Sequence, residues 1–543
     1  MVPTGAQAQK ARHVLEILGG EDVRLPFLRT APQEQKKQIG QFLGLNTNMI
    51  INENEFADME NMSSDRFPAI CTRRPRGEIM KTLSKPHGLY HKNGLCYADG
   101  TKLYYKDLAV ADVTDTDKIM VGIGAYIVIW PDKIMYNTAD GTVTPLEATW
   151  TQSATATFAL TTTGSTMVKI SSTGIGKAFQ RYDAVTISGC TNAAFNRTTV
   201  IQEKEDNYIV VIGDLSATFT QASGLTLKRT VPDMDYVCES ENRLWGCSSA
   251  NHEIYASKLG DPTNWQAFEG ISTDSYAVTV GSDGDFTGCI SHLGYVLFFK
   301  GDTIHKVFGN KPSNYQVTTS TPMRGVAKGC EGTICIVNET LMYVSRDDVC
   351  SFDGAQPESI GEAVKGLGFD AGVASHYNGK YYASLRDSAG RWGLYVFDLS
   401  KGLWHKEDSL HALYMAYGEG ELYCIDEHGN LFTIAGDRQE TISWSLESGD
   451  LIEGSVEYKH VKRLMYNMII TPGAEVNAYI RYDDDPSWKK INTFTSKSYR
   501  THIMTVVPGR CQRYRIRLDG IGDVTLIAIG KVIGQGSELH GSL

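Results

Sequence analysis

Paired acidic residues occur along the sequence, but none of them stands in a specific catalytic motif. Glycoside hydrolysis needs two facing carboxylates, and Asp347-Asp348 and the Glu419/Glu421 pair are the candidates. The stretch SRDDVCSF lacks the Gly and Trp of the Asp box, S-x-D-x-G-x-T-W, of sialidases. The motifs GxSxG, HExxH, GxGxxG and the P-loop are absent. Because acids are common in turns, we expect a protein that is not an enzyme.

Three further clusters resemble metal sites only superficially. GSDGDFTG (281–288) could hold Ca²⁺, but it lacks the twelve-residue ligand spacing of a calcium loop, which favours a turn. Asp483-Asp484-Asp485 before Pro486 is typical of a solvated hairpin tip. A zinc site would need Cys330, Cys335 and Cys350, whose spacing is wrong for a zinc knuckle. We therefore expect no metal and no cofactor.

One basic cluster is a candidate contact for a partner or for DNA. CTRRPRGEIMK (71–81) places Arg73, Arg74 and Arg76 close together. Guanidinium groups suit phosphate or an acidic protein surface, although a plain solvated loop would have the same composition.

Tryptophans are candidates for stacking on sugars. The alternative is that they fill a core or an interface between sheets. The residues are Trp130, Trp245, Trp265, Trp392 and Trp404.

Overall charge excludes one class of protein. The 543 residues include 52 Lys and Arg against 63 Asp and Glu, a formal charge of −11. A protein that grips nucleic acid by neutralising phosphates needs the opposite balance. An acidic surface instead repels phosphates, which suits a wall that DNA slides past.

Cysteines and hydropathy indicate the compartment. Eleven cysteines, an odd number without any CxxC, predict buried free thiols in a reducing environment. The sequence has no signal peptide and no run of 18 apolar residues, so we expect folding in a cytoplasm and no membrane span.

Seven stretches share one pattern of three strands joined by two turns. An apolar strand leads into a small polar turn, an aromatic-rich strand follows, and a second turn leads into the third strand. The first turn is a sequence such as HKNG, GIGA, SENR, HLG, VNET, YNG or GEG. From residue 286 they recur about every 40 residues, the length of a four-stranded propeller blade. One such sheet cannot bury both faces alone, so the repeat predicts a β-propeller of six to eight blades; a repetitive β-sandwich is the alternative. The stretches are 88–107, 119–138, 236–257, 286–309, 331–354, 371–398 and 412–435.

The remaining segments predict a mostly β protein of several parts. We expect residues 1–47 to form an N-terminal arm, with a helix at 7–19, where apolar residues recur at helical spacing, and a second short helix at 33–43. Residues 48–144 and 233–440 are the two propeller parts. A Thr-rich segment, 145–232, predicts an inserted small β-barrel or sandwich, and alternating strands in 441–543 predict a C-terminal β-sandwich.

The sequence resembles the tail nozzle, head-closure and packaged-DNA stabilisation proteins of short-tailed bacteriophages, also called tail tubular proteins. Residues 1–47 have no counterpart in this resemblance. The likeness is carried by FADMENMSSDRFPAICTRRPR (56–76), YDAVTISGCTNAAFNRTTVIQ (182–202), SWSLESGDL (443–451) and VIGQGSELHG (532–541).

The resemblance implies a structural protein of the virion tail, assembled in the host cytoplasm. It implies a homo-oligomeric ring, typically of six copies, below the portal and adaptor proteins, with tail fibre or needle proteins attached. Double-stranded DNA would pass through the ring without sequence-specific binding, and the ring would retain the packaged genome. Two alternatives stay open: a glycan-binding tail-tip or adhesin propeller protein, and a propeller hydrolase.

Overall fold

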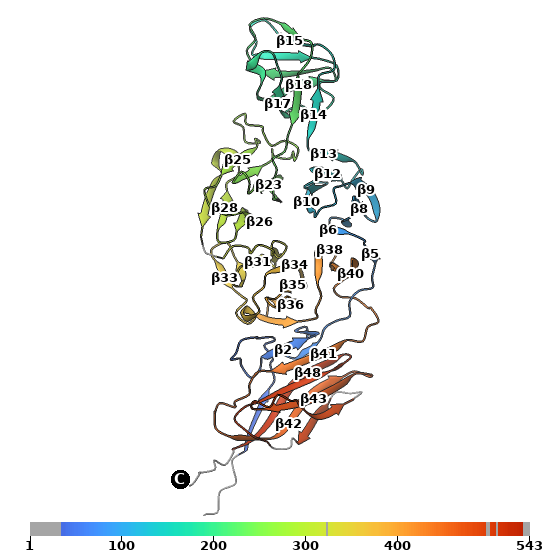
Figure 1. Ribbon diagram of the computed structural model, residues 1–543, viewed down its shortest axis with the longest axis vertical. Helices are drawn as coiled ribbons and strands as arrows, with labels where there is room; N and C mark the ends of the chain where they lie inside the picture. Colours follow the sequence, from blue (N-terminus) through green and yellow to red (C-terminus); the bar gives the residue numbers. More distant parts are fainter. Residues whose placement is uncertain (1–33, 322–323, 496–499, 506–508, 536–543) are drawn as a thin grey trace, which may run out of the picture.

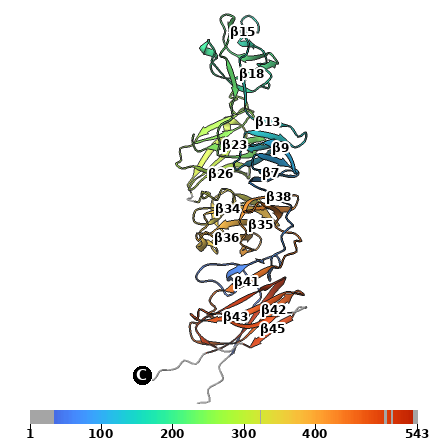
Figure 2. The same cartoon turned by 45° about the vertical axis from the view of Figure 1, so that its right-hand side comes forward.

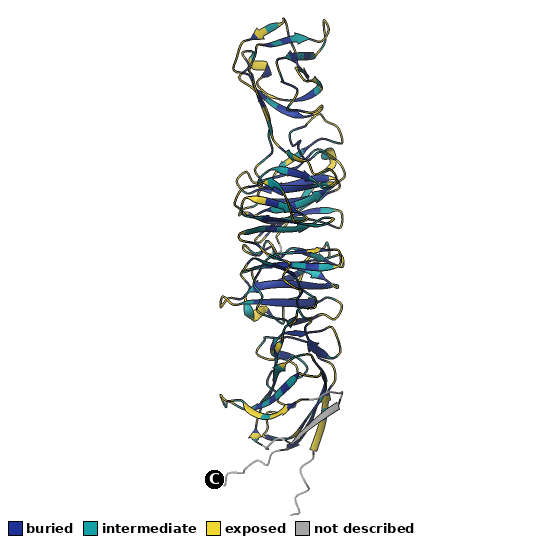
Figure 3. Ribbon diagram, turned by 90° about the vertical axis from the view of Figure 1, so that its right-hand side faces the viewer, coloured by how far each residue is buried: buried dark blue, intermediate teal, exposed yellow. Residues whose placement is uncertain are grey.

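Three β-rich modules lie in one line along an elongated molecule. The structure is a computed structural model that describes residues 34–321, 324–495, 500–505 and 509–535. Figure 1 shows an insertion at one end, a ring of sheets in the middle and a two-sheet module at the other end. The three modules stay in line in Figure 2, and Figure 3 shows the ring edge-on with buried strands in every module.

Seven four-stranded antiparallel sheets form the middle module. They are β6–β9 (Pro86–His91, Leu95–Asp99, Lys102–Tyr105, Leu108–Asp112), β10–β13 (Ile119–Ile123, Tyr126–Trp130, Ile134–Asn137, Val143–Pro145), β22–β25 (Tyr236–Ser240, Arg243–Ser248, Glu253–Ala256, Tyr276–Thr279), β26–β29 (Phe286–His292, Tyr295–Lys300, Ile304–Phe308, Gln316–Ser320), β30–β33 (Cys335–Val337, Thr340–Val344, Val349–Phe352, Pro357–Ser359), β34–β37 (Ala371–Tyr377, Lys380–Arg386, Trp392–Asp398, Leu403–Lys406), and β38–β40 (Ala412–Gly418, Glu421–Asp426, Asn430–Thr433) with β5 (Lys81–Thr82).

These sheets are arranged as a β-propeller. The first strand of one sheet contacts the first strand of the next, as in β6 with β10, β10 with β22 and β22 with β26. The last sheet contacts the first through β38 and β6 (Figure 1). The ring closes because β5, which precedes β6 in the chain, supplies the fourth strand of the last sheet. Closure leaves few strand edges open, which is the physical advantage of the architecture.

The polar turns of the repeat join the first and second strands of the sheets. Two-residue hairpin turns of the favoured type need φ above zero at both central residues. Asn338-Glu339, Asn378-Gly379 and Glu419-Gly420 all have φ between 46° and 86°. The hairpins predicted from the sequence are confirmed at these positions.

An eight-stranded antiparallel sheet forms the insertion, with its own apolar core around Phe158, Phe179 and Phe195. Its strands run in the order β14-β21-β17-β18-β19-β16-β15-β20. Their bounds are β14 (Ala148–Thr151), β15 (Ala156–Leu160), β16 (Met167–Ser171), β17 (Ala184–Ser188), β18 (Thr198–Glu205), β19 (Tyr208–Ile212), β20 (Phe219–Gln221) and β21 (Thr226–Arg229).

Both ends of the chain build the third module, a sandwich of a seven-stranded and a five-stranded sheet. The first contains β1 (Glu34–Ile39), β3 (Met62–Ser63), β4 (Ile70–Thr72), β42 (Lys459–Ile470), β45 (Arg500–Thr505), β46 (Arg510–Cys511) and β48 (Val524–Gln535). The second contains β2 (Phe56–Glu60), β41 (Ser443–Ser448), β43 (Glu475–Tyr482), β44 (Lys489–Phe494) and β47 (Tyr514–Ile521). Short 3₁₀ turns are η1 (Ala193–Phe195), η2 (Pro312–Asn314) and η3 (Lys365–Leu367).

Two expectations about the N-terminal part need correction. The predicted helix at 33–43 is wrong where the structure describes it, because residues 34–39 form β1, paired with β48. Pairing with a distant strand overrides a local helical pattern. The expected propeller boundary at residue 48 moves to about 81, because β2 and β4 pair with β41 and β48 of the sandwich. The helix expected at 7–19 lies outside the described residues.

Within the described part of the chain, no helix is long and apolar enough to cross a membrane.

Candidate functional site

Two chain segments connect the sandwich to the propeller, and we call the region around them the junction. The outgoing segment follows β4 and leads to β5, and the returning segment lies between β40 and β41. They run side by side: Gly77 N donates to Thr433 O at 2.8 Å, and Gly436 N donates to Pro75 O at 2.9 Å. The junction is therefore a paired crossing rather than a single linker.

Buried ion pairs bind the outgoing segment to the propeller. The Arg76 guanidinium lies 2.7 Å from a carboxylate oxygen of Glu407 and 2.7 Å from one of Asp408. Burial alone would raise the pKa of both carboxyls, but the Arg76 charge, together with neighbouring charges and hydrogen bonds, outweighs it and holds both values below their ordinary range. Removing one partner of such a buried pair leaves an uncompensated charge, which costs about 3–5 kcal/mol.

Arg73 also points into the protein. It contacts Glu440 at 2.8 Å and Asn61 Oδ1 at 2.6 Å. Both Arg73 and Arg76 are thus buried and paired within this chain. Of the predicted basic cluster, only Arg74 is largely exposed, with 63% of its side chain accessible and Asp65 3.5 Å away. A partner or DNA contact by Arg74 stays a prediction.

A second polar cluster ties the turn between β3 and β4 of the sandwich to the β34–β37 sheet. Lys380 Nζ donates to Ser64 Oγ at 2.8 Å and lies 2.7 Å from Asp65 Oδ1. Ser64 Oγ in turn donates to Asp398 Oδ2 at 2.8 Å. The partners lie more than 300 positions apart in the chain, so no sequence signal could have paired them.

An apolar core runs without interruption from the sandwich into the propeller. Phe42, Leu45 and Phe56 belong to the same buried cluster as Trp404 and Tyr381. At Gly44, with φ of +80°, an added Cβ would stand 2.1 Å from Trp404 O, so only glycine allows this approach. The junction therefore combines shared hydrophobic burial with buried charge pairs.

Two cavities flank the junction. The first, of about 500 Å³, lies between the N-terminal segment, β2 and the β34–β40 sheets. Its lining includes Asp58, Glu60, Trp392, His411 and Glu427. The second, of about 570 Å³, is lined by Arg66, Arg73, Arg74 and by the carboxylates Asp65, Glu440 and Asp523. Its three cations face three anions, so it offers no excess charge to a ligand.

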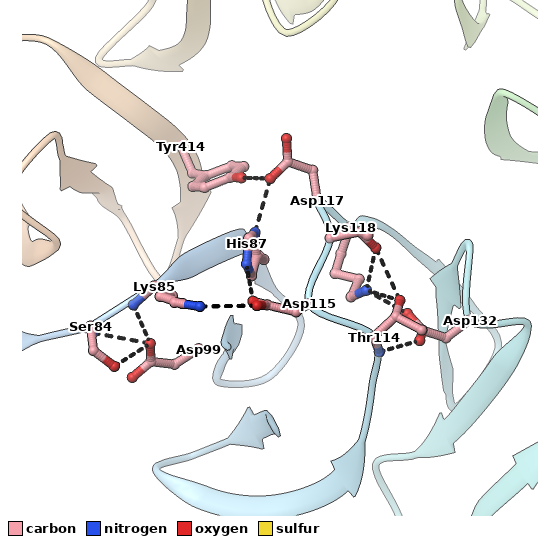
Figure 4. A network of polar contacts seen from close by, with 11 residues as sticks. Ser84, Lys85, His87, Asp99, Thr114, Asp115, Asp117, Lys118, Asp132 and Tyr414 are labelled. Atoms are coloured by element: carbon pink, nitrogen blue, oxygen red, sulfur yellow. Dashed lines mark hydrogen bonds and ion pairs between the residues drawn. The ribbon is translucent and has the colours of Figure 1, made fainter. Parts of the chain in front are cut away.

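A polar network bridges the closure of the ring (Figure 4). His87 of β6 contacts Asp115 Oδ1 at 2.7 Å through Nε2 and Asp117 Oδ1 at 3.1 Å through Nδ1. Tyr414 of β38 donates to Asp117 Oδ1 at 2.7 Å, and Lys85 Nζ donates to Asp115 Oδ2 at 3.0 Å. The network links the last sheet, the first sheet and the segment entering β10, so its arrangement favours a structural role.

The nearest arrangement to a catalytic dyad is Ser282 with His305. Ser282 Oγ lies 2.7 Å from His305 Nε2, but the other ring nitrogen meets the Thr319 hydroxyl at 2.9 Å instead of a carboxylate. Burial, helped by the Lys300 charge, lowers the pKa of His305 to about 4. A base of that strength accepts a proton poorly at neutral pH. Nothing in the sequence pattern marked this contact.

Other candidate residues take structural positions. Asp483, Asp484 and Asp485 lie at the β43–β44 hairpin tip, as expected from the sequence. All eleven cysteines are unpaired thiols, and ten are buried. No group of three or more His, Cys, Asp or Glu among the described residues is placed to hold a metal ion. Of the five tryptophans, Trp392 is partly exposed and the other four are buried, namely Trp130, Trp245, Trp265 and Trp404.

No family model matches the sequence, and no curated protein matches it. Similar solved structures include BamB from Moraxella catarrhalis (10% identity, TM-score 0.29, covering 71% of this chain and 98% of that one) and Sqt1 from Saccharomyces cerevisiae (9%, 0.33, 67% and 98%). An exo-β-1,3-galactanase from Phanerochaete chrysosporium matches at 8% identity and TM-score 0.22, covering 53% and 94%. At these TM-scores the likenesses carry no argument, so the fold stands on the sheets and contacts described above.

Proposed function

We propose that this protein is a structural, non-enzymatic subunit of a bacteriophage tail. In this proposal the seven sheets are the blades of one closed propeller, and the subunits form a hexameric nozzle or head-closure ring around the DNA channel. Portal and adaptor proteins lie above it, fibre or needle proteins attach to it, and packaged DNA is retained until infection. The sequence resemblance supplies the class of protein.

Charge segregation is the observation that carries the proposal. The propeller segments, 81–144 and 233–440, hold 36 Asp and Glu against 22 Lys and Arg, a formal charge of −14. The remaining residues, including the insertion and the sandwich, hold 27 acids against 30 bases, a formal charge of +3. An acidic propeller beside passing DNA repels phosphates and keeps the duplex mobile.

Rigidity of the junction supports the same proposal. A wall that resists DNA pressure needs modules that do not swing independently. The shared apolar core and the Arg76 and Lys380 clusters supply that coupling between sandwich and propeller.

Mass photometry of disassembled tails tests the ring directly. Six copies of 59.9 kDa predict a particle of about 360 kDa. A chain that stays monomeric even when mixed with its adaptor protein contradicts the proposal. A gel-shift titration with double-stranded DNA is the companion measurement, and we expect no retained complex at physiological salt.

The glycan-binding alternative also has one specific observation in its favour. Trp392 is the partly exposed member of the five candidate tryptophans, and it lines the 500 Å³ cavity together with several carboxylates. This cavity is compatible with a structural subunit, because none of its lining residues belongs to the ring-closure network.

A further inference from the structure

We propose that the 500 Å³ cavity at the junction binds a neutral pyranose unit of a glycan. Its volume falls in the range of small-molecule sites. The inference names residues for the glycan-binding alternative and goes beyond the proposed ring, since a single chain contains every residue of the cavity.

A fixed aromatic platform is the first requirement, and Trp392 supplies it. Its ring stacks on His411 with centroids 3.8 Å apart and planes within 13°. His411 is held in turn by Glu427, whose Oε2 lies 3.1 Å from Nδ1. An aromatic ring held in place presents a flat apolar surface at little entropic cost, and the apolar face of a pyranose packs against such a surface.

Hydrogen-bond acceptors beside the platform are the second requirement. Asp58 of β2 lines the cavity and is exposed, and its carboxylate forms no hydrogen bond or ion pair with the described residues. Among the described residues, the Glu427 carboxylate has only histidine partners, His411 and, at 3.9 Å, His428. Ionised carboxylates accept strongly from hydroxyl donors, so sugar hydroxyls match these two groups.

Charge selects neutral sugars over acidic ones. The two cations of the cavity are already compensated: Lys406 Nζ lies 2.5 Å from Glu60 Oε2, and Arg391 contacts Asp387 at 2.8 Å. The lining holds four carboxylates against these two cations, a formal charge of −2 with histidine counted as neutral. A carboxylated or phosphorylated sugar would meet repulsion there.

Oligosaccharide titration of the full chain tests the inference. The neutral probes are maltohexaose, cellohexaose, mannohexaose and chitohexaose, and the acidic probe is hexagalacturonic acid. Calorimetry and saturation-transfer NMR should detect at least one neutral probe with a Kd of about 1 mM or tighter. Hexagalacturonic acid should bind at least about tenfold more weakly.

Variants locate the site. Trp392→Ala should abolish detectable binding, and Asp58→Asn, a change at an exposed carboxylate, should weaken it about three- to tenfold. The matched control is Trp488→Ala, which removes a partly exposed tryptophan stacked on Arg481 in the sandwich and should leave binding unchanged. Thermal melting checks that each variant folds.

Three results would overturn the inference: no neutral probe binds, the acidic probe binds best, or binding survives both Trp392→Ala and Asp58→Asn. None of these bears on the ring, which is tested by particle mass. Glycan binding by a chain that also stays monomeric when mixed with its adaptor protein would instead refute the ring and leave the cavity assignment intact.

Discussion

The propeller is joined to its two neighbours in different ways. At the sandwich side, the two modules share one apolar core and several buried ion pairs. At the insertion side, the shared apolar cluster consists of Ala184, Val200 and Ala267. Contacts there are mainly polar: Asn264 Nδ2 donates to Tyr182 O at 2.7 Å, and Gln202 Nε2 donates to Glu269 Oε1 at 2.7 Å.

Because of this difference, the sandwich and the propeller form one unit, which we call the fused body, whereas the insertion is a separately attached module. Burial of apolar surface and desolvated charge pairs make unfolding of the sandwich and propeller cooperative. The insertion has its own core and few apolar contacts outside it. We therefore expect two unfolding units: sandwich with propeller, and insertion alone.

Replacing Arg76 should give the largest effect. Arg76→Met leaves Glu407 and Asp408 buried without their cation and should lower the free energy of unfolding of the fused body by about 3–5 kcal/mol. Urea denaturation followed by tryptophan fluorescence measures it. The control is Arg74→Met, an exposed arginine whose loss should cost no more than about 0.5 kcal/mol. Equal effects of the two changes would refute the assignment of Arg76.

The corresponding change in the insertion should be confined to that module. Arg229 lies 2.6 Å from buried Asp183 and donates to Leu146 O at 3.1 Å. Arg229→Met should destabilise the insertion by about 3 kcal/mol because Asp183 loses its partner. Hydrogen exchange resolves the two units: faster exchange in 148–229 with unchanged protection of the sandwich is expected. Loss of protection throughout would show that the units are one.

Acid should act on the two units in opposite directions. Burial lowers the pKa of His305 to about 4 from 6.5, so the unfolded chain binds more protons between these values and propeller stability falls by up to about 3 kcal/mol. Glu407 and Asp408 have pKa values lowered from 4.5 and 3.8, so their contribution to stability is lost progressively as the pH falls below those ordinary values.

Asp183 in the insertion behaves oppositely, because burial raises its pKa above 3.8. Its folded form binds a proton first, so its contribution to insertion stability increases as the pH falls toward 3.8. Melting curves between pH 7 and pH 4 should show the fused body losing stability faster than the insertion. His305→Gln should flatten the loss for the fused body; an unchanged slope would exclude His305 as the cause.

The smallest effect should come from the insertion joint. Asn264→Ala removes the bond to Tyr182 O and the acceptor for Ala184 N, which lies 3.2 Å from Oδ1. We expect a loss of about 1–2 kcal/mol, seen as faster exchange at 182–184 while both cores stay protected. A loss comparable to that of Arg76→Met would mean that the insertion is fused to the propeller as firmly as the sandwich is.

Local patterns predicted the repeated sheets well. Turns such as VNET and YNG favour positive φ at two successive residues, as a tight hairpin requires. The same local reading failed at 33–43, where the chain pairs as β1 with residues almost 500 positions away. It also failed at residues 48–80, because polar composition there did not reveal pairing of β2 with β41.

The candidate site was predicted less well for the same reason. The basic cluster at Arg73, Arg74 and Arg76 stood out in the sequence, but its carboxylate partners Glu407, Asp408 and Glu440 lie more than 300 positions away. Trp392 was one of five equal candidates until burial separated it from the others.

By itself, the sequence determined an acidic, mostly β chain with hairpin repeats, because turn chemistry and strand alternation act between residues close along the chain. Tertiary structure alone decided that β5 completes the last sheet of the ring, which strands share a sheet, and which arginines are buried. Those outcomes depend on long-range burial and desolvation, and such energies exist only once distant segments meet.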